Sequence, residues 1–170
     1  MPPFQIDIDI QDQKWLSVIP DIEGITHNII TTILVQFFPK AQYLEVSIVL
    51  SDDDFIQRLN KQYRDKDKAT NVLSFPQTEI DDINADTPFL MLGDIIISSD
   101  TIASEATEQN KDIKSHFTHM LVHGCLHLLH YDHIIESEAE EMEQLEIKIL
   151  KTLGIKNPYE IQLTYDIIEQ

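Results

Sequence analysis

A cluster of histidines late in the chain places the strongest constraint on its fold. Six of the seven histidines lie between His116 and His133, and the first five of these are three or four residues apart. Side chains four residues apart on an α-helix are neighbours, roughly 5–6 Å apart at Cβ. The spacing therefore predicts a helix over about 111–129 that carries imidazoles along one face and is followed by a turn.

Two histidines of this helix can chelate one metal ion, and a third ligand has to come from beyond the helix end. His119 and His127 are separated by about 12 Å along a helix axis, so they cannot share an ion. His123, His127 and His133 have the ligand spacing of the metzincin zinc proteases, in which a turn swings the last histidine over the first two. Three neutral imidazoles leave the fourth position of Zn²⁺ open for a water whose pKa falls to about 7. The residues thus predict one catalytic Zn²⁺ per chain and a hydrolase.

The same motif departs from the proteases at one position. Their general-base glutamate would stand at position 124, where this chain has Gly124. A zincin-like peptidase therefore remains only an alternative. Cys125 is two residues beyond His123, faces away from the ligands and is expected to be a small core residue.

Composition indicates one domain over residues 1–170, because 42% of the 170 residues are hydrophobic and can form a full core. The single cysteine excludes an intrachain disulfide, and no stretch is apolar enough to cross a membrane. We expect a cytoplasmic protein without a membrane partner. The net charge of −18 argues against loose binding of polyanions. However, five of the twelve Lys and Arg residues fall between Arg58 and Lys68, so an acidic body can carry one basic face.

Periodicity predicts an α+β fold in which about four strands form a mixed sheet packed against helices. Alternating or β-branched segments indicate strands at Phe4–Ile10, Tyr43–Leu50, Val72–Phe75 and Phe89–Ser98. Helical spacing indicates one or two helices from about 13 to 38, with breaks at Pro20 and Gly24, and further helices at about 52–63, 100–108 and 111–129. A last helix is expected to begin at a capping box formed by Ser137 and Glu140 and to end at Leu153, before Gly154.

The histidine motif and two other segments of the chain resemble the YbeY family of bacterial endoribonucleases. The segment from His123 to His133, HGCLHLLHYDH, is similar to the family signature H-G-x-x-H-L-x-G-Y-D-H. Residues 59–76 and 92–98 are similar to its L-N-x-x-Y-R-x-K-D-x-x-T-D-V-L-S-F-P and L-G-D-I-x-I-S segments. His130 stands where the signature has a turn glycine, a position that favours positive φ. The resemblance covers about 59–159, whereas the first 58 residues match only in general pattern.

The resemblance implies a zincin-like fold with a metal-binding helix that ends in a turn. It also implies a single-strand-specific, zinc-dependent endoribonuclease that matures the 3′ end of 16S rRNA and acts in ribosome quality control. Its partners would be single-stranded RNA, specifically precursor 16S rRNA, and the ribosome or its proteins. His123, His127 and His133 carry over as zinc ligands, and Arg64 carries over to the catalytic groove.

Several roles follow from residue type as hypotheses. Arg64 would clamp the charge that develops on the phosphate, and Lys61, Lys66 and Lys68 would bind the RNA backbone. Asp132 and His119 would orient ligand imidazoles, although Asp132 could equally cap the turn. The general base, and the choice between water and a ribose 2′-OH as nucleophile, stay open. A ribosome-assembly factor with a mainly structural zinc is a further alternative, which a fourth ligand from His130 or His119 would favour.

Overall fold

The computed structural model describes residues 4–84, 86–132 and 135–159. All four strands precede the last three helices, and most elements follow the segments that periodicity predicts. In chain order they are β1 (Phe4–Ile10), α1 (Lys14–Val18), α2 (Ile22–Phe37), β2 (Tyr43–Ser51), α3 (Asp53–Arg64), β3 (Val72–Pro76), a 3₁₀ turn (Ile80–Asp82), β4 (Phe89–Ser98), α4 (Ser99–Glu108), α5 (Ile113–Leu128) and α6 (Glu136–Thr152).

The four strands form one mixed sheet in the order β1-β2-β4-β3. β1, β2 and β4 are parallel, and β3 pairs antiparallel with β4 as an edge strand. The β2–β4 register shifts between Glu45 and Val46, opposite Gly93, whose φ is +132°. A Cβ at Gly93 would lie 2.1 Å from the carbonyl oxygen of Phe75, so the close approach of β3 requires glycine here.

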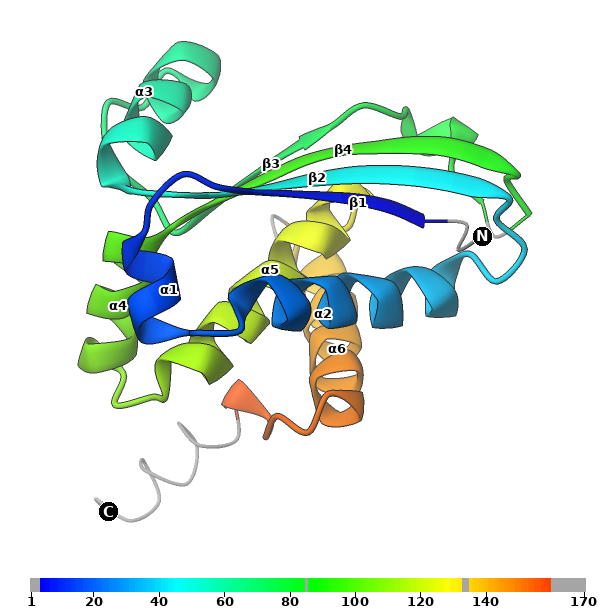
Figure 1. Ribbon diagram of the computed structural model, residues 1–170. Helices are drawn as coiled ribbons and strands as arrows, with labels where there is room; N and C mark the ends of the chain where they lie inside the picture. Colours follow the sequence, from blue (N-terminus) through cyan, green and yellow to red (C-terminus); the bar gives the residue numbers. More distant parts are fainter. Residues whose placement is uncertain (1–3, 85, 133–134, 160–170) are drawn as a thin grey trace.

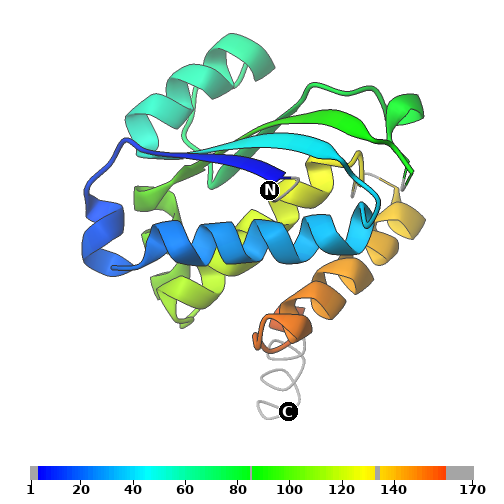
Figure 2. The ribbon, with the colours of Figure 1, turned by 45° about the vertical axis from the view of Figure 1, so that its right-hand side comes forward.

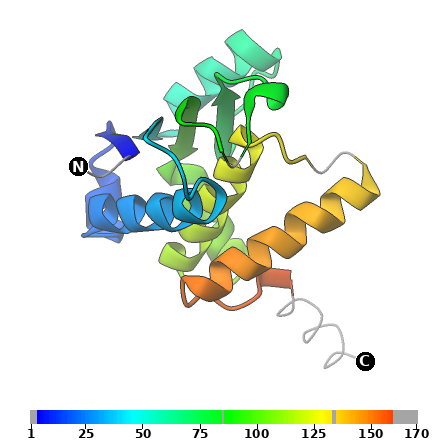
Figure 3. The ribbon, with the colours of Figure 1, turned by 90° about the vertical axis from the view of Figure 1, so that its right-hand side faces the viewer.

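Helices cover both faces of this sheet, but unequally. α2 and α5 lie against one face, whereas α3 packs over the end of the opposite face (Figures 1 and 3). β1 and β2 alternate between inward and outward side chains, as half-covered strands do. The end of β4 is buried on both sides at Ile95, Ile96 and Ile97, because α5 lies below it and α3 above it.

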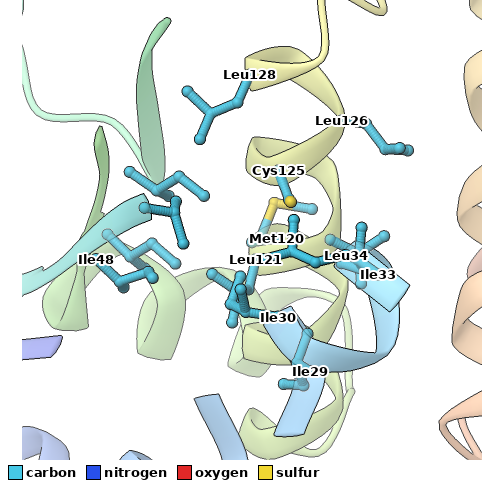
Figure 4. Packing of buried hydrophobic residues seen from close by; sticks show 14 of the residues in the cluster. Ile29, Ile30, Ile33, Leu34, Ile48, Met120, Leu121, Cys125, Leu126 and Leu128 are labelled. Carbon is cyan, nitrogen blue, oxygen red and sulfur yellow. The ribbon is translucent and has the colours of Figure 1, made fainter. Parts of the chain in front are cut away.

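The main core lies between the sheet, α2 and α5. Figure 4 shows leucine, isoleucine and methionine side chains of these three layers in contact, with Cys125 on the same side of α5. A second, small cluster of Ile56, Leu73 and Ile96 fixes α3 on the outer face. The fully buried Trp15 of α1 packs edge-on against Phe117 of α5, with ring centroids 5.2 Å apart. α5 is therefore held from three sides, which makes it a rigid support for the histidines.

Two expectations about helix boundaries need correction. Pro20 separates α1 from α2 as expected, but Gly24 lies inside α2 and does not break it. The capping box at Ser137 is wrong, because α6 begins one residue earlier, at Glu136, and its N-cap Ile135 makes no side-chain cap. The other end of α6 agrees with expectation, since Gly154 follows it at φ +80°. Within the described ranges no helix is long and apolar enough to span a membrane.

Candidate metal centre

α5 carries the predicted metal pair on its last two turns. Its first turn is capped by Asp112, whose side chain accepts from the Ser115 N–H. After its last residue, Leu128, the chain turns at His130, which has a φ of +69°. The helix and the turn that the histidine spacing predicts are both present.

His123 and His127 point at each other across one turn of α5. Their Nε2 atoms are 3.0 Å apart, and the ring planes are inclined by 81°. Both side chains are half-buried. Two imidazole nitrogens that converge in this way fit two ligands of one tetrahedral metal ion.

A buried carboxylate on α6 contacts one histidine of this pair. Glu146, 1% exposed, lies with Oε1 2.5 Å from His123 Nδ1. Since an ionised carboxylate only accepts, His123 Nδ1 donates this hydrogen bond, and in the neutral ring that leaves the lone pair on Nε2, which faces His127. Burial by itself raises the pKa of the Glu146 carboxyl, but the hydrogen bonds that it receives outweigh burial and lower the pKa to about 2.

The third predicted ligand, His133, lies outside the described residues. Within 4–84, 86–132 and 135–159, no group of three or more His, Cys, Asp or Glu residues is arranged to hold a metal ion. The described part of the chain thus presents two of the three predicted ligands, His123 and His127. Asp132, predicted to orient a ligand or cap the turn, is half-buried in the turn after α5.

The remaining histidines of the cluster use their Nε2 atoms elsewhere. His119 Nε2 donates to Glu146 Oε2 at 3.0 Å, and His116 Nε2 donates to Glu105 Oε1 at 2.9 Å. His130 Nε2 donates to the carbonyl oxygen of Thr78 at 2.7 Å, which ties the chain just after β3 to the end of α5. His119 therefore supports the carboxylate that holds His123, and His130 joins Thr78 to the turn.

Gly124 faces the sheet, where a side chain does not fit. A Cβ at this position would lie 2.9 Å from Val72 Cγ2 and 3.1 Å from Ile95 Cγ2. The Gly124 carbonyl also accepts a hydrogen bond from Ser74 Oγ at 2.7 Å. A glutamate here would have to displace β3, so this packing argues against a peptidase of the zincin type.

The same strand connects the metal helix to Arg64. Arg64 is the last residue of α3, and its Nη2 donates to the Ser74 carbonyl oxygen at 2.9 Å. Its guanidinium lies 5.7 Å from the centre of the Phe75 ring. Ser74 thus contacts Arg64 through its carbonyl and Gly124, the neighbour of His123, through its hydroxyl. Arg64 is therefore held against the same strand that packs on the metal-bearing helix at Gly124.

The predicted backbone-binding residues lie around the end of α3. Lys61, Lys66 and Lys68 are all exposed, and Lys61 Nζ lies 3.8 Å from Asp67 Oδ2, a weak solvated pair. The buried Asn60 organises this turn, because its carbonyl accepts from the Lys66 N–H and its Nδ2 donates to the Lys68 carbonyl. The basic face therefore rests on a defined backbone, although Asp65 and Asp67 reduce its net charge.

Comparison with known proteins shows the family to which this chain belongs. Residues 7–154 match the sequence profile described as Endoribonuclease YbeY. The chain belongs to the YbeY endoribonuclease family. The protein named Endoribonuclease YbeY of Agrobacterium fabrum is 52% identical over 124 residues, 73% of this chain and 72% of that protein. Its namesake in Sinorhizobium fredii is 40% identical over 177 residues and the full length of both chains.

A solved structure supports the fold of this YbeY family member. The solution structure of TM1509 from Thermotoga maritima matches with a TM-score of 0.52 and 22% identity, over 88% of this chain and 92% of that one. The α+β class and the mixed four-stranded sheet expected from the sequence are therefore confirmed.

Several residues of the centre escaped prediction from the sequence. Glu146 lies among the apolar positions of α6, between the buried Met142 and Ile149. An acidic residue on the apolar face of a helix is a signal that could have identified it. Ser74 and Asn60 carry no such signal, since their roles depend on contacts between β3 and α5 and within one turn.

Proposed function

We propose that this protein is a zinc-dependent endoribonuclease specific for single strands, with His123, His127 and His133 as the ligands. The observation that carries the proposal is the convergence of two imidazole nitrogens, 3.0 Å apart, on a helix that packs against the edge strand to which Arg64 donates. Family membership supplies the substrate class, since the relatives are named endoribonucleases. A zinc ion held there would polarise a phosphoryl oxygen and acidify water or a ribose hydroxyl.

The chain's own residues would bind and orient the RNA. A guanidinium has five N–H donors, so Arg64 can keep its bond to Ser74 and still clamp phosphate oxygens. Lys61, Lys66 and Lys68 are exposed, and in this proposal they contact backbone phosphates on either side of it. We further propose that the RNA is the 3′ end of precursor 16S rRNA and that the cleavage also serves ribosome quality control, with the ribosome or its proteins as partners.

Zinc acts in catalysis in this proposal and is not a structural staple. A structural site is usually closed by four protein ligands. The two candidates for a fourth ligand, His119 and His130, direct their Nε2 atoms at Glu146 and at the Thr78 carbonyl. These contacts support an open site over a closed one.

The first test is cleavage of a single-stranded RNA oligomer and of its duplex by the zinc-loaded protein. We expect the single strand to be cut, His127→Ala to abolish cutting, and Arg64→Lys to slow it about 100-fold, because lysine keeps the charge but loses the planar fork. Fragments that end in a 2′,3′-cyclic phosphate would identify the 2′-OH as nucleophile. Full cleavage by folded His127→Ala would refute the proposal.

Elemental analysis tests the ligand set separately. We expect about one zinc per chain and its loss in folded His133→Ala. Zinc retained at full occupancy in that variant would mean that other histidines hold the ion.

A further inference from the structure

One buried carboxylate collects three hydrogen bonds at the back of the metal pair. Glu146 Oε1 accepts from His123 Nδ1 at 2.5 Å. Its other oxygen, Oε2, accepts from His119 Nε2 at 3.0 Å and from the Tyr159 hydroxyl at 2.5 Å. The three donors come from two turns of α5 and from the segment that follows α6.

These contacts determine how His123 can act. A proton held on Nδ1 leaves Nε2 as a lone pair, which is the form a metal ligand needs. The bond to Oε1 also fixes the ring plane. Without it, the imidazole could protonate Nε2 or rotate, and either change would remove a donor from the pair that faces His127.

The two bonds to Oε2 fix the carboxylate itself. A buried carboxylate with one partner could rotate about its side-chain torsions, whereas Glu146 is tied at both oxygens. Tyr159 stands face-to-edge on His119, with ring centroids 5.8 Å apart and planes at 86°, so its hydroxyl is held by packing as well. The segment after α6 therefore completes the support of a helix that lies far from it in the sequence.

We propose that Glu146 is a positioning residue of the metal centre, and that Tyr159 holds it in that role. The inference rests on the proposed function in one respect, namely that His123 is a metal ligand. It adds that zinc affinity depends on a carboxylate of α6 and on the contact that Tyr159 makes with it.

A matched control is the carboxylate that pairs with His116, a histidine of the same helix, α5. Glu105 of α4 accepts from His116 Nε2 at 2.9 Å and also from Asn71 Nδ2 at 3.1 Å. This pair has the same chemistry and lies two turns before His123. However, the other ring nitrogen of His116, Nδ1, is buried without a hydrogen-bond partner among the described residues. Hydrogen bonds therefore do not continue from Glu105 through His116 to His123 and His127.

The experiment is zinc affinity of the purified full chain, measured by competition with a chromophoric chelator. We expect Glu146→Gln to bind zinc about 10- to 100-fold more weakly, the usual cost of removing a partner of a ligand histidine. Tyr159→Phe should weaken binding about fivefold, as one net hydrogen bond is lost. Glu105→Gln should stay within about twofold of wild type.

A second readout excludes a general loss of structure. Nitrogen-15 NMR of the histidine rings in the metal-free protein should show His123 protonated at Nδ1 in wild type and in Glu105→Gln, but not in Glu146→Gln. Thermal unfolding identifies a variant that fails to fold. If Glu146→Gln does not fold, Tyr159→Phe still provides the test, because it removes only a hydroxyl.

The outcomes separate this proposal from the function. Wild-type affinity in both Glu146→Gln and Tyr159→Phe would overturn it, as would an equal loss in Glu105→Gln. A wild-type chain that binds no zinc would overturn it together with the metal assignment. The expected order of affinities in a chain that cuts no RNA would support the positioning role and refute the nuclease.

Discussion

At the scale of single residues, Gly124 shows how closely β3 approaches the metal helix. Its missing Cβ leaves room for Val72 and Ile95, and its carbonyl accepts from Ser74. We predict that Gly124→Ala lowers the free energy of unfolding by about 1–2 kcal/mol. The overpacking of about 1–3 kcal/mol exceeds the gain of up to about 1 kcal/mol in helix propensity. Urea unfolding followed by circular dichroism measures the difference.

Gly24 provides the control for that substitution. It lies in the first turn of α2, and a Cβ there would meet the flexible Asp21 carboxylate at 2.9 Å. Because that side chain can move, Gly24→Ala should leave stability unchanged or raise it slightly. An equal loss in both variants would mean that contact with β3 does not explain the need for glycine at 124.

The residues that could be predicted are those whose role depends on local spacing. His123 and His127 follow from a separation of four residues on a helix. Glu146 and Tyr159 could not be placed, because they reach His123 through a buried contact 23 residues away in sequence and through the chain beyond α6. Spacing gives the face of a helix but not the partner packed against it.

At the scale of elements, α5 carries the metal pair on one side and packs against the hydrophobic core with another. His123 and His127 are half-buried on one side, and Cys125 is fully buried against the core on another (Figure 4). Burial raises the pKa of the Cys125 thiol to about 12, so the reactive thiolate is scarce at neutral pH.

We therefore predict that Cys125 resists thiol reagents while the protein is folded. At pH 8, a chromogenic disulfide reagent should titrate no thiol in native protein and one thiol per chain in denaturant, given the single cysteine. Labelling in step with the rate of global unfolding would support a sealed α5–α2 interface. Rapid labelling of the native protein would show that this interface opens locally.

Helices and strands were predicted well where the apolar pattern extends over many residues. Their ends were predicted poorly where a single capping or breaking residue was taken to set the boundary. All four strands and the histidine-bearing helix follow from their apolar patterns. Gly24 and Ser137 misled the prediction, because a glycine is tolerated in a first helical turn and α6 begins without a side-chain cap. The sequence does not give the partner of α6, which packs against α5 and lies farther from the sheet than α5 does (Figures 1 and 2).

At the scale of the whole molecule, a net charge of −18 opposes an RNA ligand, and the turn after α3 has to provide the contacts. We predict a shallow salt dependence, with a slope of log affinity against log salt of about −2 to −3 for three or four phosphate contacts to a single strand. Lys66→Ala should reduce the slope by about 0.7. Binding of an uncut deoxy-substituted strand at several salt concentrations measures it.

Lys40 is the matched control for this measurement. It is also exposed, pairs with Asp86 at 3.2 Å, and precedes β2, whereas α3 follows the far end of the same strand. Lys40→Ala should therefore leave the slope unchanged. Equal slopes for wild type, Lys66→Ala and Lys40→Ala would show that the turn after α3 does not contact the RNA.

Trp15 has a practical consequence for experiments on this protein. It is the only tryptophan of the chain, it is fully buried, and its indole N–H donates to the Ser51 carbonyl at 3.0 Å. Its ring contacts Phe117, which precedes His123 by about 9 Å along α5. Native emission should therefore be blue-shifted and come from a single site. Unfolding can then be followed without a dye, by a reporter near the opposite end of the helix that carries the ligands.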